Sequence, residues 1–264
     1  MGALEVLTGF VTAPGTTLTA WTMASGNSAT IRDFPEAKGA MLVQAWADNQ
    51  TAGTMRIISQ KLHEATQGIR LQISLSDTSP LLPWGMPQRF FKNDPLTLQL
   101  SGSATAGDIE TGALLVYYEE LPGTAARFIT ADDVMKRKRH VFGVENTLAL
   151  GTAGGYSGEE AINAEFDIFK ANTDYALLGY TVSAECAVVG WRGVDTGNLR
   201  VGGPGHETLR HVTGEWFVRL SRMYGVALVP VFQSNNRGGI LIDGAQDENG
   251  TDTTVISIFA ELGP

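Results

Sequence analysis

Three features of the sequence predict an all-β protein made of two tandem β-sandwiches. The 264 residues are enough for two domains of ordinary size, each with its own core. Short runs of Val, Ile, Leu, Thr, Tyr and Phe alternate with turn residues, and the 31 glycines favour strands over helices. A strand, loop and strand pattern near the middle of the chain also returns at its C-terminus.

This repeated pattern predicts two similar units. Residues 98–102 precede a polar loop and residues 113–121, and residues 240–244 precede a polar loop and residues 254–262. Each copy predicts a β-hairpin whose second strand ends in an aromatic residue followed by Glu-Leu. The copies lie at the middle and at the end of the chain, so two units of comparable length would fill it.

The strands of the first unit follow in order between turn signals. A segment rich in proline, residues 80–95, predicts an edge, a bulge or a crossing between sheets. The hairpin over residues 96–119 closes the unit. The remaining predicted strands are residues 4–12, 17–23, 29–34, 40–46, 55–59 and 68–75.

The second unit repeats this order in five short matches. About eight strands per unit, of ordinary length, predict two tandem jelly-roll β-sandwiches that arose by internal duplication. We expect the first jelly roll over residues 1–123, a linker with a short helix over 124–143, and the second jelly roll over 144–264. Residues 29–34 and 40–46 match the second unit at one offset of 135 residues. The matches are 17–20 with 147–150, 29–34 with 164–169, 40–46 with 175–180, 68–71 with 197–201, and 81–83 with 228–230.

Two stretches predict helices. Residues 130–140 begin with a threonine that can cap the helix, followed by acids in the first turn and bases in the last, which the helix dipole favours. Residues 206–224 place apolar side chains on one face, although Gly214 interrupts the pattern and residues 215–220 could instead form a strand.

The predicted linker helix carries the one local charge anomaly of an acidic chain. The formal net charge is −9, which argues against broad binding of nucleic acid over the whole surface. Four adjacent cations, Lys136, Arg137, Lys138 and Arg139, nevertheless form a basic run. This run predicts either a solvated helix end or a contact with phosphates of lipid headgroups or packaged nucleic acid.

No motif in the sequence predicts catalysis, a cofactor or a metal. Cys186 lies in an apolar run and is expected to be a buried small hydrophobe. His206 and His211 lack the spacing of metal ligands on one helical face. The acidic loop from Asp243 to Asp252 misses the spacing of a calcium loop, so a solvated loop is expected there and ion binding is left open. No apolar stretch approaches the roughly 20 residues of a membrane-spanning helix.

Two jelly-roll-sized sandwiches joined by a short linker resemble the double jelly-roll major capsid proteins of tailless icosahedral, membrane-containing bacteriophages. The resemblance rests on architecture. It implies a structural protein without enzymatic activity, made in the host cytoplasm and located in the virion. It further implies homotrimers of pseudo-hexagonal outline in a capsid lattice, with upright sandwiches. Other capsid proteins such as vertex proteins, and an internal membrane or genome beneath the shell, are the implied partners, with no small-molecule substrate.

Two further expectations accompany this resemblance. The irregular segments 60–67, 80–95 and 202–205 are expected to make the contacts between subunits. The alternative function is a tandem jelly-roll protein that binds or processes carbohydrate, in which Trp84, Trp191 and Trp216 would stack on sugars.

Overall fold

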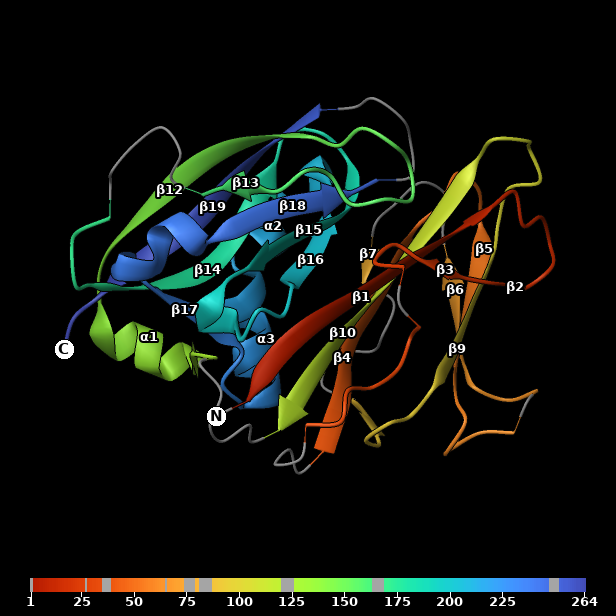
Figure 1. The fold of residues 1–264 in the computed structure, drawn as a ribbon, viewed down its shortest axis with the longest axis horizontal. Helices are drawn as coiled ribbons and strands as arrows, with labels where there is room; N and C mark the ends of the chain where they lie inside the picture. Colours follow the sequence, from red (N-terminus) through yellow and green to blue (C-terminus); the bar gives the residue numbers. More distant parts are fainter. Residues whose placement is uncertain are drawn as a thin grey trace.

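The computed structural model is mostly β-structure with few helices, so the predicted all-β sandwich class is confirmed (Figure 1). The structure describes residues 2–26, 28–34, 39–64, 66–73, 79–80, 87–119, 126–162, 169–246 and 252–264. Every strand pair within these residues is antiparallel, as a sandwich of meandering and crossing strands requires.

The first half consists of two sheets. Sheet I has the order β3-β1-β10-β4-β7, with β8 also paired to β4, and sheet II has the order β2-β9-β5-β6. The strands are β1 (Ala3–Thr12), β2 (Thr19–Ala20), β3 (Thr22–Met23), β4 (Gly39–Asp48), β5 (Gly53–Ser59), β6 (Ile69–Ile73), β7 (Ser79–Pro80), β8 (Gln88–Phe90), β9 (Leu96–Ser101) and β10 (Ile109–Glu119).

The second half also consists of two sheets. Sheet III has the order β11-β17-β14-β19-β12, and sheet IV has the order β13-β18-β15-β16. The strands are β11 (Phe128–Ile129), β12 (Lys138–Ala149), β13 (Glu160–Ala161), β14 (Asp174–Val182), β15 (Cys186–Arg192), β16 (Val201–Gly205), β17 (Val229–Gln233), β18 (Leu241–Ala245) and β19 (Asp252–Leu262).

The two halves share one strand order. We number eight strands of each half along the chain, which leaves out the short strands β3, β7 and β11. Sheets I and III then each run first, eighth, third, sixth, and sheets II and IV each run second, seventh, fourth, fifth. The numbered strands are β1, β2, β4, β5, β6, β8, β9 and β10 in the first half, and β12 to β19 in the second.

The sequence prediction of two hairpins is wrong in the same way in both halves. β9 lies in sheet II whereas β10 lies in sheet I, and β18 lies in sheet IV whereas β19 lies in sheet III. The polar loop after each of β9 and β18 therefore carries the chain from one sheet to the other. β10 pairs with β1 and β4, which are distant from it in sequence. Its side chains are buried on both faces of sheet I, and burial on both faces favours a central position in the sheet.

Three other sequence interpretations need correction. Residues 202–205 are not an irregular surface segment, because they lie in the buried strand β16 and so cannot make the expected contacts between subunits. Residues 147–149, which the sequence matched with residues 17–20, are the end of β12, the first strand of the second half. They therefore do not correspond to β2, which is the second strand of the first half. Residues 29–34 form only an isolated bridge between Thr30 and Pro95. Residues 81–86 and 163–168, which carry parts of two sequence matches, lie outside the described residues.

One sheet of each half is buried on both faces where the halves meet. β4 and β10 of sheet I and β15, β16 and β18 of sheet IV are buried along nearly their whole length. Backbone and side-chain bonds cross this junction: Val6 N donates to Arg200 O at 2.8 Å, and Trp46 Nε1 donates to Ala187 O at 2.8 Å. The two sandwiches therefore share one continuous core.

The helices lie in the second half and in the connection that leads to it. They are α1 (Ala131–Arg137), α2 (Arg210–Thr213) and α3 (Trp216–Tyr224), with 3-10 turns η1 (Val194–Thr196), η2 (Glu207–Leu209) and η3 (Ser234–Gly239). The predicted helix over 206–224 is divided at Gly214 and Glu215, and Gly225 ends α3 in the left-handed conformation with φ 68°. No helix among the described residues is long and apolar enough to cross a membrane.

Candidate functional site

Helix α1 places the first half of the basic run, and its sequence explains why the helix forms. Thr130 Oγ1 accepts a hydrogen bond from Asp133 N at 3.1 Å, and the Asp133 side chain returns to the backbone of Thr130 to complete a capping box. Thr130 Oγ1 also donates to Asp133 Oδ2 at 2.7 Å, and this bond, together with the one from Thr130 N to the same oxygen, holds the pKa of Asp133 below its ordinary value. Ala131 and Val134 are buried, and Ala131 N donates to Ser221 Oγ of α3 at 2.9 Å. One face of the helix is thus fixed against the second half.

The basic run is divided between a helix and a strand. The helix predicted over 130–140 ends at Arg137, because Lys138 takes an extended conformation and begins β12 opposite Leu262. Lys136, Lys138 and Arg139 are exposed, whereas Arg137 is half-buried. In the part of the chain that the structure describes, neither Lys136 nor Lys138 makes an ion pair within 4.0 Å.

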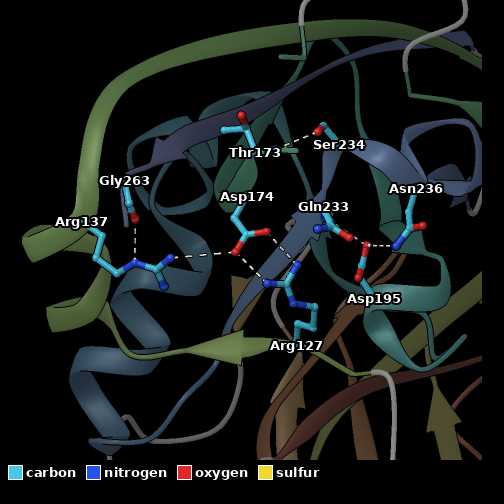
Figure 2. A network of polar contacts seen from close by, with 9 residues as sticks. All are labelled: Arg127, Arg137, Thr173, Asp174, Asp195, Gln233, Ser234, Asn236 and Gly263. Carbon is cyan, nitrogen blue, oxygen red and sulfur yellow. Dashed lines mark hydrogen bonds and ion pairs between the residues drawn. The ribbon is translucent and has the colours of Figure 1, made fainter. Parts of the chain in front are cut away.

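Arg137 is bound into the fold (Figure 2). Its Nε donates to the carbonyl of Gly263 at 3.0 Å, and a terminal nitrogen lies 3.9 Å from Asp174 Oδ2. The same carboxylate receives both terminal nitrogens of Arg127, at 2.8 and 2.6 Å, and these hydrogen bonds raise the pKa of Arg127. Asp174 thus joins β14 to the linker and, through Arg137, to the C-terminal end of the chain.

Arg139 faces a second carboxylate, that of Glu261, which is buried and which the sequence did not reveal as a site. The side chain of Glu261 is only 2% exposed, and one of its oxygens lies 3.6 Å from Arg139. Lys170 donates to its other oxygen at 2.6 Å, and His140 Nδ1 lies 3.3 Å from it. The hydrogen bond from Lys170 is the largest cause of a lowered pKa of Glu261, and the nearby charges of Lys170, His140 and Arg139 lower it further.

The cationic side chains around Asp174 and Glu261 form a surface on which positive charges outnumber the carboxylates that pair with them. We call Lys136, Arg137, Lys138, Arg139 and Lys170 the basic edge. It lies where α1, the start of β12 and the end of β19 meet, close to the C-terminus (Figure 1). Because Arg137 and Arg139 are engaged by Asp174 and Glu261, Lys136 and Lys138 are the cations best placed to meet an external anion.

Other residues considered from the sequence are placed in the core or in local bonds. Cys186 is fully buried, as predicted. Asp243 does not lie in a solvated loop, because it is buried and accepts hydrogen bonds from Nε and a terminal nitrogen of Arg200. Residues 247–251, the rest of the acidic loop, lie outside the described residues. The described residues contain no cluster of three or more His, Cys, Asp or Glu side chains that could hold a metal.

Two of the three tryptophans expected to stack on sugars, Trp191 and Trp216, lie in the core. Trp191 and Trp216 are fully buried, and their indole nitrogens donate to Ser257 Oγ at 3.0 Å and to Gly202 O at 3.1 Å. Trp84 lies outside the described residues. Sugar stacking on Trp191 and Trp216 is therefore excluded by their burial.

Comparisons with known proteins give only distant likenesses. No family model and no curated protein matches the chain. Similar solved structures include the exported protein XepA of PBSX, with 11% identity and a TM-score of 0.31 over 97% of this chain and 86% of that chain. They also include the major capsid protein P2 of bacteriophage PM2, with 7% identity and a TM-score of 0.24 over 100% and 98% of the two chains. The Macrobrachium rosenbergii nodavirus structure gives 9% identity and a TM-score of 0.20 over 98% and 91%.

Proposed function

We propose that this chain is a structural protein of a virion, a major capsid protein whose two halves are jelly rolls related by internal duplication. The observation that carries the proposal is the strand order shared by the halves. In each half the first strand lies beside the eighth, the second beside the seventh, the third beside the sixth and the fourth beside the fifth. A folded antiparallel ribbon of eight strands, which is a jelly roll, produces this order.

An irregularity shared by the third strands supports the duplication. In β4, Val43 is an extra residue between Leu42 and Gln44, which pair with consecutive residues of β10. In β14, Leu178 is an extra residue in the same way against β19. Both extra residues are the fifth of their strands, and their separation equals the offset at which the sequence matches. Bulges at one position in two strands are typical of a common ancestor.

The proposed domain division is the one expected from the sequence, with the difference that β12, the first strand of the second half, already begins at Lys138 inside the expected linker. A first jelly roll over residues 1–123, a linker over 124–143 and a second jelly roll over 144–264 would make each chain a rigid body of two lobes. Three such chains would give the six lobes of a pseudo-hexagonal homotrimer, which in turn would pack in a capsid lattice with vertex proteins. The continuous core between the lobes supports this rigidity.

The mass of the purified protein tests the assembly. Light scattering coupled to size exclusion should give the mass of three chains, or of a larger particle, with a single species dominating at high concentration. An exclusively monomeric protein with native circular dichroism at the highest soluble concentration would contradict the capsid proposal.

We further propose that the basic edge faces the interior of the particle and binds anionic lipid or packaged genome. Each cation near an anionic membrane contributes roughly 1 kcal/mol, and salt weakens the attraction. Lys136 and Lys138 are the residues to change, because Arg137 and Arg139 also stabilise the fold. The double variant Lys136→Ser with Lys138→Ser should weaken binding to anionic vesicles or to nucleic acid by about 2 kcal/mol at low salt.

A matched variant separates this contact from the general effect of charge. Lys61→Ser with Arg70→Ser removes the same charge from exposed positions of the first half. Vesicle co-sedimentation measures binding to anionic lipid, and filter binding measures binding to nucleic acid. Weaker binding is expected for the Lys136 and Lys138 variant alone. Equal binding by both variants would mean that the run is only a solvated helix end.

A further inference from the structure

A polar cavity of about 330 Å³ lies between the two halves of the molecule. β1 and the segment after β3 form one side of it, and residues preceding β16, at the end of β15 and around Tyr156 form the other. Its size is near the lower end of the range for sites that hold small molecules. None of the residues of the basic edge lines this cavity.

Three arginines from both halves line the cavity. Arg32 belongs to the first half, and Arg192 and Arg200 belong to the second. Each is paired with one carboxylate: Arg32 with Glu5, Arg192 with Glu159 and Arg200 with Asp243. Only Glu5 among these three carboxylates lines the cavity, so the lining residues include three that carry a positive charge and one that carries a negative charge.

The arginines retain hydrogen-bond donors after these pairings. A guanidinium has five N–H groups, and Arg32 and Arg200 each use Nε and one terminal nitrogen on their carboxylates, while Arg200 also has a hydrogen bond with Tyr156. Glu5 has little acceptor capacity left, because Arg32 Nε donates to one of its oxygens at 2.7 Å and Tyr118 Oη to the other at 2.7 Å. Donors therefore exceed acceptors at the cavity wall.

The arginine from the second half is held in place before any ligand arrives. The Arg200 side chain is 16% exposed, and its guanidinium lies 3.5 Å from the centre of the Tyr156 ring. Tyr156 Oη donates to Thr8 Oγ1 of β1 at 2.7 Å, and burial raises the pKa of Tyr156, so the phenol keeps its proton. Thr8 Oγ1 can then donate its own proton into the cavity, where further hydroxyl groups come from Ser25, Ser28 and Thr30.

We propose that this cavity binds a small oxyanion, a molecule that carries phosphate or several carboxylate groups. Such a ligand supplies what the wall lacks, which is negative charge and many acceptor oxygens for preorganised N–H and O–H donors. Because Arg32 lies on one half and Arg192 and Arg200 on the other, the bound ligand bridges the two halves. This inference is independent of the proposed capsid function.

Calorimetric titration and thermal unfolding of the full chain test the proposal. Inorganic phosphate, pyrophosphate and citrate are the probes, with sodium chloride at matched ionic strength as the reference. At least one probe should bind with measurable heat and raise Tm above the chloride reference, as a ligand selective for the folded state must. Comparing the affinities for phosphate and pyrophosphate with the affinity for citrate shows whether the cavity prefers phosphate or carboxylate groups.

Two exposed ion pairs provide matched variants. Arg192→Gln removes a cavity arginine that is 39% exposed, and Arg89→Gln removes an arginine that is 59% exposed and pairs with Glu119 away from the cavity. Loss of charged hydrogen bonds should weaken binding by Arg192→Gln about tenfold or more, whereas Arg89→Gln should bind like the unchanged protein.

A second variant guards against a simple loss of folding. Arg32→Lys keeps the charge beside buried Glu5 but removes the planar fork of donors, so it should fold and bind more weakly. Absence of binding by every probe, a Tm change no larger than that of chloride, or equal affinities for Arg192→Gln and Arg89→Gln would each overturn the proposal.

Discussion

Glu261 shows how a single buried carboxylate organises the basic edge. It lies near the end of strand β19, and three side chains from two other segments converge on it: Lys170, Arg139 and His140. A buried carboxylate is costly unless it is paired, and Lys170 provides the closest partner at 2.6 Å. The basic run therefore has a structural role at Arg139 in addition to any external contact.

This pairing predicts a dependence of stability on pH. The pKa of Glu261 is lowered in the folded protein, so its contribution to stability is complete above the unfolded-state pKa and is lost as the pH falls through the folded-state pKa. Glu261→Gln should therefore be less stable than the unchanged protein at neutral pH. The difference in free energy of unfolding should shrink on acidification below the ordinary glutamate range, as measured by urea denaturation at a series of pH values.

The control for this prediction is a glutamate on the exposed side of the same sheet. Glu145 of β12 is exposed and pairs in register with Ile256. Glu145→Gln should change stability little at every pH. A Glu261→Gln deficit that stays constant down to strongly acidic pH would show that lost packing, and not charge pairing, is responsible.

The partners of the basic run illustrate why this site was only partly predictable. The four cations and the helix cap are adjacent in sequence, so composition and spacing indicated both, although not that the helix ends at Arg137. Asp174 and Glu261 lie far along the chain, and strand pairing brings them to the run. The Glu-Leu ending of each repeat was visible in the sequence, but local pattern gives no sign of which side chains converge on it.

At the scale of elements, the packing of α2 on the bulge in β14 explains why residue 179 is a glycine. Register between β14 and β19 shifts between Leu177 and Gly179, and α2 packs directly on this point. A Cβ at Gly179 would lie 2.2 Å from the carbonyl oxygen of Thr213, which is backbone and cannot move aside cheaply. The glycine thus permits close approach of the helix to the sheet.

Substitution of this glycine is expected to be destabilising. Gly179→Ala should lower the free energy of unfolding by about 1–3 kcal/mol, because α2 and β14 must separate to admit the methyl group. Gly158→Ala is the matched change, since a Cβ there would meet nothing within 4 Å. Urea denaturation followed by circular dichroism measures both. Equal stabilities of the two variants would show that the helix shifts without cost.

Element positions were predicted better than element partners. Runs of β-branched and aromatic residues indicated most long strands, since these residues suit the pleated surface, and β4, β5 and β6 begin within a few residues of the expected positions. The hairpins were wrong because a short polar loop looks the same whether it returns within one sheet or crosses to another. Continuous burial of β10 arises from the second half packing on sheet I, which no local pattern contains.

At the scale of the whole molecule, α3 contacts the third strand of each half, β14 and β4. It packs on β14, and Tyr224 Oη at its end donates to the carbonyl of Val43, the bulged residue of β4, at 2.5 Å. At its start, the ring of Trp216 meets the ring of Trp46 edge to face, with centroids 6.0 Å apart. The halves are thus joined through a helix as well as through sheets I and IV.

The Trp46 and Trp216 pair predicts energetic coupling between the halves. Both indoles are fully buried and both donate to backbone of sheet IV, to Ala187 O and to Gly202 O. Trp46→Phe should cost about 1–3 kcal/mol, because it leaves the Ala187 carbonyl without this donor. Aromatic pairs contribute about 0.5–1.5 kcal/mol beyond their buried area.

A double-mutant cycle with Trp46→Leu, Trp216→Leu and the double variant measures that coupling across the junction, because leucine removes the aromatic ring at each position. We expect an interaction free energy of about 0.5–1.5 kcal/mol, with a single unfolding transition in every variant, because the two halves share one core. Circular dichroism in urea reports all four proteins without relying on the tryptophans that are changed. Additive effects, or two separate transitions in the unchanged protein, would mean that the halves fold as independent lobes and that α3 only rests between them.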